Sequence, residues 1–393
     1  MPRKGTRNAQ GGGTIRQRKD GRWEARYTVG RDPGTGKQVQ KSVYGKTQAE
    51  VRKKLQAATV SIDAGMYIEP AKLSVGQWCD IWLKEYTAHI KPSTKTSYEI
   101  HVKNHIKPNL GMVKLQALTA HAVQGFVNAL EAVDGSGKGL SPKTVKNVHG
   151  VLHKALEQAR QIGYISHNPA GGTKLPRWTR PEIKPLEYDM VAKFMEAIKG
   201  HQFERVYLID LFTGLRRSEI LGLTWDCIDF DNGTIYVYRQ LQRLRKAYSF
   251  APLKNDRPRL ITPAPDVMQV LREQKVKQME WRLMAGQVWQ PWQDENLIFT
   301  NEIGGHLCDQ TVYNHFKQIM ADLGLPQTRL HDLRHTYAVM SLQAGDDVKT
   351  VQEHLGHHTA AFTLDQYGHI TERMRKESAD RMQALIDGIK GKS

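Results

Sequence analysis

The chain has 393 residues, more than one hydrophobic core of ordinary size can hold, so we expect two or three domains. Its 57 Lys and Arg outnumber 40 Asp and Glu, and the formal net charge of +17 favours nucleic acid as a partner over an anionic membrane surface. No stretch approaches the roughly 18 apolar residues of a membrane span, and the N-terminus lacks the apolar core of a secretory signal, so we expect a cytoplasmic protein with no membrane partner.

Residues 1–70 are predicted to form a basic domain, with 15 Lys and Arg against 6 Asp and Glu. Apolar and polar residues alternate in GTIRQRKDGRWEARYTVG around an Asp20–Gly21 turn, and QVQKSVYG continues as a third strand. The next stretch, TQAEVRKKLQAATVSIDAG, predicts a helix. A three-stranded sheet with one helix, carrying interleaved basic and aromatic residues, could lie in a groove of duplex DNA. A basic solubilising domain is the alternative.

Residues 73–172 are predicted to form an all-helical domain. Helical periodicity runs through four segments: VGQWCDIWLKEYTAHI, STKTSYEIHVKNHI, TAHAVQGFVNALEAV and SPKTVKNVHGVLHKALEQARQIGYI. Start and stop signals agree with it, since Ser93 follows Pro92, Pro142 opens the last helix and Asn168 precedes a proline. The Lys and His side chains of these helices could face phosphates or simply be solvated. Residues 173–185 then form a basic linker between domains.

Residues 186–393 are predicted to form a mixed α+β domain, mainly helical, that carries the chemistry. Its helices flank a short strand cluster made of TIYVYRQ and a second hairpin arm around APLKNDRPRLITP. The end of the chain predicts a tail helix with a narrow apolar stripe formed by Met374, Met382, Leu385, Ile386 and Ile389. Such a stripe needs a packing partner, either in the same chain or in another.

The first of four polar clusters in this domain is FTGLRRSEILGL. Thr213 and Gly214 break one helix and place Arg216 at the start of the next, where a guanidinium can face a bound anion. Glu219 lies one turn later and can orient that arginine. A surface arginine with an i,i+3 ion-pair partner is the alternative interpretation.

The second cluster is HDLRH, in which His331, Arg334 and His335 share one helix face. Zinc binding by the two imidazoles is a competing interpretation, but Arg334 between them would repel a cation and no HExxH carboxylate is present. The cysteines form no CxxC pair and predict neither a disulfide framework nor a zinc site: Cys79, Cys227 and Cys308. We therefore expect neither a metal nor a cofactor.

The third and fourth clusters lie close together near the C-terminus. In EHLGHH, Gly356 either lets His357 approach another backbone or caps a helix. In LDQYGH, Tyr367 would by itself be read as a structural residue. The meaning of both clusters depends on the two before them.

Taken in order, TGLRRSE, LHDLRH and LGHHTAAFTLDQYGH resemble the signature of tyrosine recombinases, the phage and transposon integrases related to lambda integrase. The basic module and the helical segment resemble the arm-binding and core-binding domains of such integrases. The resemblance implies six catalytic residues: Arg216, Lys254, His331, Arg334, His357 and the nucleophile Tyr367. Glu219 and His335 would contact and orient these catalytic residues without touching the DNA.

This resemblance implies a site-specific recombinase that integrates or excises a mobile element. The enzyme would cleave duplex DNA at core sites, bind arm sites, form a 3′-phosphotyrosine and pass through a Holliday junction as a homotetramer, with an excision factor as a further partner. Arg216 and Arg334 would meet the charge on the phosphate, and Lys254 would protonate the departing 5′ oxygen. A type IB topoisomerase is the alternative enzyme, and a DNA-binding regulator with a decayed site is the alternative outside catalysis.

Overall fold

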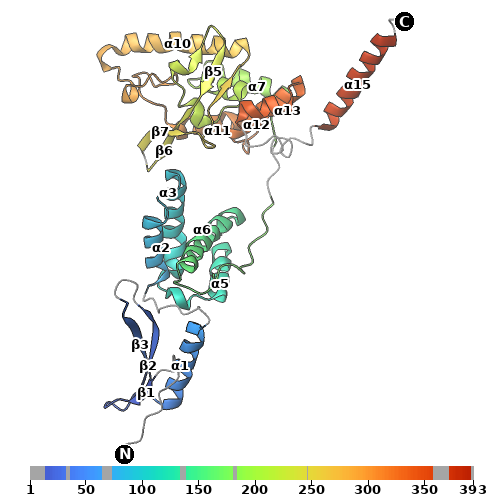
Figure 1. Cartoon of the computed structure of the whole chain (residues 1–393). Helices are drawn as coiled ribbons and strands as arrows, with labels where there is room; N and C mark the ends of the chain where they lie inside the picture. Colours follow the sequence, from blue (N-terminus) through green and yellow to red (C-terminus); the bar gives the residue numbers. More distant parts are fainter. Residues whose placement is uncertain are drawn as a thin grey trace, which may run out of the picture. The chain divides into compact units, whose positions relative to one another are not determined.

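The fold is given by a computed structural model that describes residues 14–31, 36–63, 73–132, 139–179, 184–245, 247–356 and 371–390. The chain divides into two compact units, residues 1–179 and 180–393. The predicted fold class is confirmed, because a small sheet with a helix, an all-helical segment and a mixed, mainly helical region follow one another (Figure 1). The finer domain boundaries stay predictions. None of the described helices has the length and apolar character needed to cross a membrane.

The N-terminal sheet contains three antiparallel strands in chain order: β1 (Thr14–Gln17), β2 (Trp23–Arg31) and β3 (Gln38–Gly45). The helix α1 (Gln48–Asp63) packs on one face, where Ala25 and Tyr27 of β2 are buried against Val51 and Leu55. The strand alternation places Glu24 on the other face. Glu24 is 2% exposed, and its carboxylate accepts hydrogen bonds from Arg16, Ser42 and Arg26. The hydrogen bond from Arg16 makes the largest contribution to lowering the pKa of this carboxylate.

The helical segment has the four predicted helices, with an extension of the second. Its elements are α2 (Val75–Glu85), α3 (Pro92–His101), the π-helix η1 (Val102–Ile106), α4 (Lys107–Leu110), the 3-10 turn η2 (Leu115–Ala117), α5 (Ala120–Glu131) and α6 (Pro142–Gln161). The π-helix ends two residues before Pro108, which has no N–H to donate, and the N–H of Lys107 bonds the Val102 carbonyl. The helix therefore runs on through the proline with one wider turn.

Trp78 lies at the centre of this helical core. Its side chain is fully buried, and its indole N–H donates to the Ala155 carbonyl of α6 at 2.7 Å. The helix that carries it starts with a capping box, in which Ser74 and Gln77 bond each other's backbone N–H groups. One polar contact and an apolar interior therefore fix α2 against α6.

The second unit is built from helices around two small sheets (Figure 1). Its helices are α7 (Tyr188–Ile198), α8 (Glu204–Thr213), α9 (Arg217–Ile220), α10 (Pro265–Ala285), α11 (Asp309–Asp322), α12 (His331–Ala344), α13 (Val348–Leu355) and α15 (Thr371–Lys390). Its 3-10 turns are η3 (Trp225–Cys227), η4 (Gly286–Val288) and η5 (Trp292–Asp294). The strands are β4 (Ile228–Asp229), β5 (Thr234–Val237), β6 (Arg239–Leu244), β7 (Ala247–Pro252) and β8 (Arg259–Ile261).

The strand cluster differs in one respect from the predicted hairpin arm. β7 pairs with β6, whereas β8 pairs with β5, so the segment APLKNDRPRLITP passes from one sheet to the other. The Asp256 N–H closes a turn on the Leu253 carbonyl at 3.0 Å, and Pro258 lacks the N–H that a continuing ladder would need. Lys254 lies in this crossing turn rather than within a hairpin.

We predict that Trp78→Phe lowers the free energy of unfolding by about 2 kcal/mol, because it removes the indole N–H from a buried carbonyl and leaves unfilled volume. Urea unfolding followed by circular dichroism measures the change. Trp178→Phe is the matched control: Trp178 is 37% exposed, so we expect a change within about 0.5 kcal/mol. Equal effects of the two substitutions would contradict the central role of Trp78.

Candidate active site

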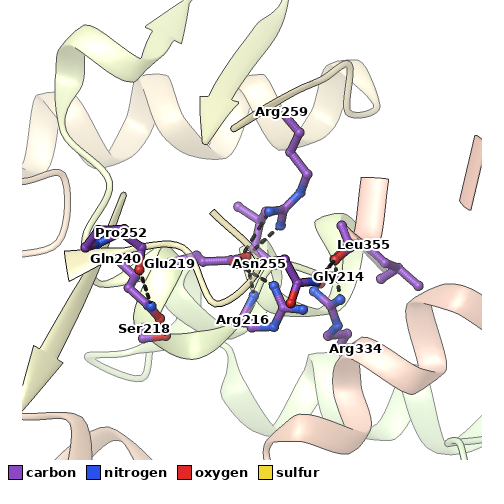
Figure 2. Close-up of polar contacts among 12 residues, drawn as sticks. Gly214, Arg216, Ser218, Glu219, Gln240, Pro252, Asn255, Arg259, Arg334 and Leu355 are labelled. Carbon is purple, nitrogen blue, oxygen red and sulfur yellow. Dashed lines mark hydrogen bonds and ion pairs between the residues drawn. The ribbon is translucent and has the colours of Figure 1, made fainter. Parts of the chain in front are cut away.

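Arg216 is placed by a helix break and a short helix. α8 ends at Thr213, and Gly214 has a φ of 62°, where an added Cβ would run into the Tyr337 ring. The chain then turns so that Arg216 becomes the N-cap residue of α9. Its backbone N–H donates to Glu219 Oε2 at 3.0 Å, and its Nη1 donates to Oε1 at 2.7 Å (Figure 2).

Glu219 joins two arginines below the surface. Its side chain is 1% exposed, and Arg259 Nη2 donates to its Oε2 at 2.6 Å. Burial alone would raise the pKa of Glu219, but the attraction and hydrogen bonds of Arg259 and then Arg216 outweigh it and lower the pKa to about 2. The carboxylate is therefore ionised at neutral pH and holds both guanidiniums.

Arg259 was not among the predicted site residues. Its Nε donates to the His354 carbonyl at 2.7 Å, and this bond ties β8 to the end of α13. Gly356 ends that helix with a φ of 61°, and a Cβ there would lie 3.1 Å from Arg259 Nη1. One sequence feature could have indicated a buried position for Arg259. It lies two residues before Ile261 in a strand, so the two side chains point to the same face, and Ile261 is buried.

Arg334 reaches the Arg216 turn from α12. Its side chain is among the largest that are fully buried, at 1% exposure. Nη1 donates to the Gly214 carbonyl at 2.6 Å, and Nη2 donates to the Leu355 carbonyl at the end of α13 (Figure 2). Because Gly214 lies two residues before Arg216, the structure brings together the two predicted arginines from stretches over a hundred residues apart.

The two histidines of HDLRH lie beside Arg334. The rings of His331 and His335 are 5.0 Å apart and nearly perpendicular, and His335 is 8% exposed. His331 is exposed, but its imidazole is partly desolvated, and this desolvation lowers its pKa. The positive charges of His335 and Arg334 lower the pKa of His331 further. Its neutral imidazole is thus favoured at neutral pH, so it can both donate and accept a hydrogen bond.

Asp210 is a further charged residue that the sequence did not single out. It lies in α8 at 3% exposure, and burial raises its pKa well above its ordinary value, against the opposing attraction of Arg334 and Arg217. Its Oδ1 has no hydrogen-bond partner among the described residues. Burial thus shifts Asp210 toward its protonated form, which carries no negative charge.

Lys254 is exposed in the crossing turn, and its neighbour Asn255 donates to the Gly356 carbonyl at 3.1 Å. The turn of the predicted lysine is thereby joined to the end of α13. His357 and Tyr367 lie outside the described residues. No group of three or more His, Cys, Asp or Glu side chains that could hold a metal ion occurs in the part of the chain that the structure describes.

This arrangement suits the binding of a phosphate diester. Arg216 is 20% exposed in its side chain, so it reaches solvent, while Glu219 and the backbone carbonyls fix the guanidiniums behind it. Guanidinium groups can bond phosphate oxygens in a bidentate manner at any physiological pH.

Comparison with known proteins identifies the family. Residues 185–374 match the Phage integrase family, and residues 74–131 match the phage integrase N-terminal SAM-like domain. The chain belongs to the phage integrase family of tyrosine recombinases. Membership confirms the predicted enzyme class, a site-specific DNA recombinase that transfers DNA strands.

Relatives within the family cover nearly the whole chain. A XerC-like tyrosine recombinase of Caldanaerobacter subterraneus subsp. tengcongensis is 28% identical, over 91% of this chain and 95% of the relative. The Tn1549 transposon integrase, solved with transposon right end DNA, has a TM-score of 0.66 at 23% identity, over 79% of this chain and all of that one. A lambda integrase tetramer bound to a Holliday junction has a TM-score of 0.53 at 20% identity, over 88% of this chain and 96% of that one. These two structures share the fold.

We predict that Glu219→Gln destabilises the second unit in a pH-dependent way. Because the pKa of Glu219 is depressed in the folded state, its stabilisation is complete above its ordinary pKa of 4.5 and is lost as the pH falls toward 2. The difference from wild type should shrink from about 3 kcal/mol at pH 6 to about 2 kcal/mol at pH 3.5.

Urea unfolding at a series of pH values measures this difference. Glu302→Gln, at an exposed position, is the matched control and should show a small difference at every pH. A Glu219→Gln difference that stays constant or grows on acidification would contradict the ion-pair assignment.

Proposed function

We propose that this recombinase cleaves DNA through attack of Tyr367 on a scissile phosphate that Arg216 and Arg334 bind. The observation that carries the proposal is the joining of both arginines at the Gly214–Arg216 turn, with Glu219 buried behind them. The remaining proposed catalytic residues are Lys254, His331 and His357, and the proposed supporting residues are Glu219 and His335. We assign the finer domain roles in the same way: residues 1–70 bind arm sites, 73–172 bind core sites, 173–185 link them to 186–393.

The cleavage step balances without an energy donor. The phenolic oxygen of Tyr367 forms a bond to phosphorus, the bond between phosphorus and the 5′ oxygen breaks, and that oxygen keeps the electron pair and takes a proton from Lys254. A neutral imidazole such as His331 can accept the phenol proton. Attack by another 5′ hydroxyl on the phosphotyrosine reverses these events and reseals DNA.

We propose duplex DNA as the partner and a homotetramer as the working assembly, acting in the cytoplasm on the ends of a mobile element. The charge of +17 supports DNA binding through phosphate contacts. The described fold is shared with a transposon integrase solved with DNA and with a lambda integrase tetramer on a Holliday junction. An excision factor is a further proposed partner.

We predict that Tyr367→Phe abolishes the covalent adduct on a nicked suicide substrate and leaves DNA binding intact, because only the attacking oxygen is lost. The adduct is measured by denaturing electrophoresis. Tyr188→Phe is the matched control: Tyr188 is 55% exposed at the start of α7, so the adduct should persist. An adduct formed by the Tyr367→Phe variant would refute the nucleophile. Strand exchange between two sites supports a recombinase, and relaxation alone would indicate a topoisomerase.

We predict that the tail helix α15 docks on a neighbouring protomer. Its apolar side chains Met382, Leu385 and Ile389 are 57%, 59% and 65% exposed. Leu385→Glu with Ile389→Glu should lower recombination and tetramer formation about tenfold or more, because an unpaired charge in an apolar contact costs well over about 1 kcal/mol.

Gel filtration of the DNA complex and a two-site recombination assay measure these effects. Ala384→Glu, on the opposite helix face, is the control and should leave both unchanged. Deletion of residues 374–393 that leaves tetramers and recombination unchanged would exclude docking in trans.

A further inference from the structure

The turn that carries Lys254 is anchored on its N-terminal side by the protein core. Leu253 is 3% exposed and packs in the hydrophobic core of the second unit. The hydrogen bond from the Asp256 N–H to the Leu253 carbonyl closes the four residues into a tight turn. The backbone of Lys254 is therefore held, while its side chain extends from an exposed position.

A first side-chain bridge ties this turn to the Arg216 region. Ser218 of α9 donates through Oγ to Gln240 Oε1 at 2.8 Å, and Gln240 Nε2 donates to the Pro252 carbonyl at 2.7 Å (Figure 2). Ser218 is the residue between Arg217 and Glu219, and Pro252 lies two residues before Lys254. The Gln240 amide thus joins α9 to the residue two positions before the lysine, in addition to the backbone pairing of β6 and β7.

A second bridge ties the other side of the turn to α13. Asn255 Nδ2 donates to the carbonyl of Gly356, which ends α13 in a left-handed conformation. The preceding residue, Leu355, accepts from Arg334, and His354 accepts from Arg259. The Lys254 turn is therefore attached at one end to the element that places Arg216 and at the other to the element that Arg334 contacts.

We propose that Gln240 and Asn255 are positioning residues that place Lys254 for proton donation. A lysine side chain is long and flexible, and a general acid must come within hydrogen-bond reach of the oxygen it protonates. Two amides that fix the backbone on either side of the lysine limit where its ammonium can go relative to the phosphate-binding arginines. This inference rests on the proposed role of Lys254 as general acid.

The chemistry of the leaving group separates positioning from general structural support. When sulfur replaces the bridging 5′ oxygen, the bond between phosphorus and sulfur breaks and a thiolate departs with the electron pair. A thiol is a far stronger acid than an alcohol, so a thiolate leaves without receiving a proton. A defect confined to proton donation disappears with the sulfur substrate, whereas a distorted site remains slow with both.

The experiment compares adduct formation on two nicked duplexes that carry the attachment site taken from the DNA flanking the gene, one with oxygen and one with sulfur at the scissile 5′ position. We expect Asn255→Ala and Gln240→Ala to slow the oxygen reaction by about 10- to 100-fold, because a catalytic group misplaced by about 1 Å loses that much. The sulfur reaction should proceed at the wild-type rate. Asn255→Asp, which keeps the shape but lacks the donor, should behave like Asn255→Ala.

Two further variants make the result decisive. Asn232→Ala, the matched control, removes an amide that bonds Asp229 in the β4–β5 turn, and should react normally with both substrates. Lys254→Ala should react slowly with the oxygen substrate and at the normal rate with the sulfur substrate.

If the sulfur substrate does not restore the rate of Lys254→Ala, the proposed general acid is wrong, and the inference falls with it. If sulfur restores Lys254→Ala but not the Asn255 and Gln240 variants, or if those variants react normally with oxygen, only the positioning inference is overturned.

Discussion

A buried carboxylate with a guanidinium on each side is the interaction on which the candidate site depends. Taking Glu219 out of water is costly, and the cost is offset only because both its oxygens accept hydrogen bonds from arginines. The four-residue helix α9 is too short to be stable alone, so Arg216 keeps its place through this carboxylate and the surrounding packing. Since Arg259 also bonds the end of α13, the same carboxylate connects α9, β8 and α13.

The protonation states around this carboxylate leave the site with an excess of positive charge. Arg216, Arg259 and Arg334 are permanent cations, while burial favours the neutral form of Asp210 and the surroundings of His331 favour its neutral ring. Glu219 pairs with two of the three guanidiniums, Arg216 and Arg259, so the single ionised carboxylate does not neutralise the three cations, and the excess of positive charge suits the proposed binding of a phosphate. The neutral histidine keeps a lone pair that a cation would lack, so the proposed mechanism assigns charge stabilisation and proton transfer to different residues.

Local patterns in the sequence predicted the local parts of this structure. Alternation gave the three N-terminal strands, helical periodicity gave α2 to α6, and the spacing of Arg216 and Glu219 is the separation of one helical turn. The contacts of Arg259 with Glu219 and of Arg334 with Gly214 join residues 40 and 120 positions apart, which no local period encodes. For the same reason the passage of the chain from β7 to β8 looked like a hairpin. The catalytic roles of all six predicted residues remain predictions, and two of these residues, His357 and Tyr367, lie outside the described residues.

The span of the Arg334 contacts has a consequence for how the enzyme is made. The N-terminus of a chain leaves the ribosome first, so N-terminal segments can fold while later segments are still being synthesised. Arg334 donates to the carbonyls of Gly214 and Leu355, so the proposed phosphate-binding site stays incomplete until almost the entire polypeptide has emerged. Nascent chains therefore contain the basic N-terminal segments, which we propose bind DNA, well before the contacts of Arg334 can form.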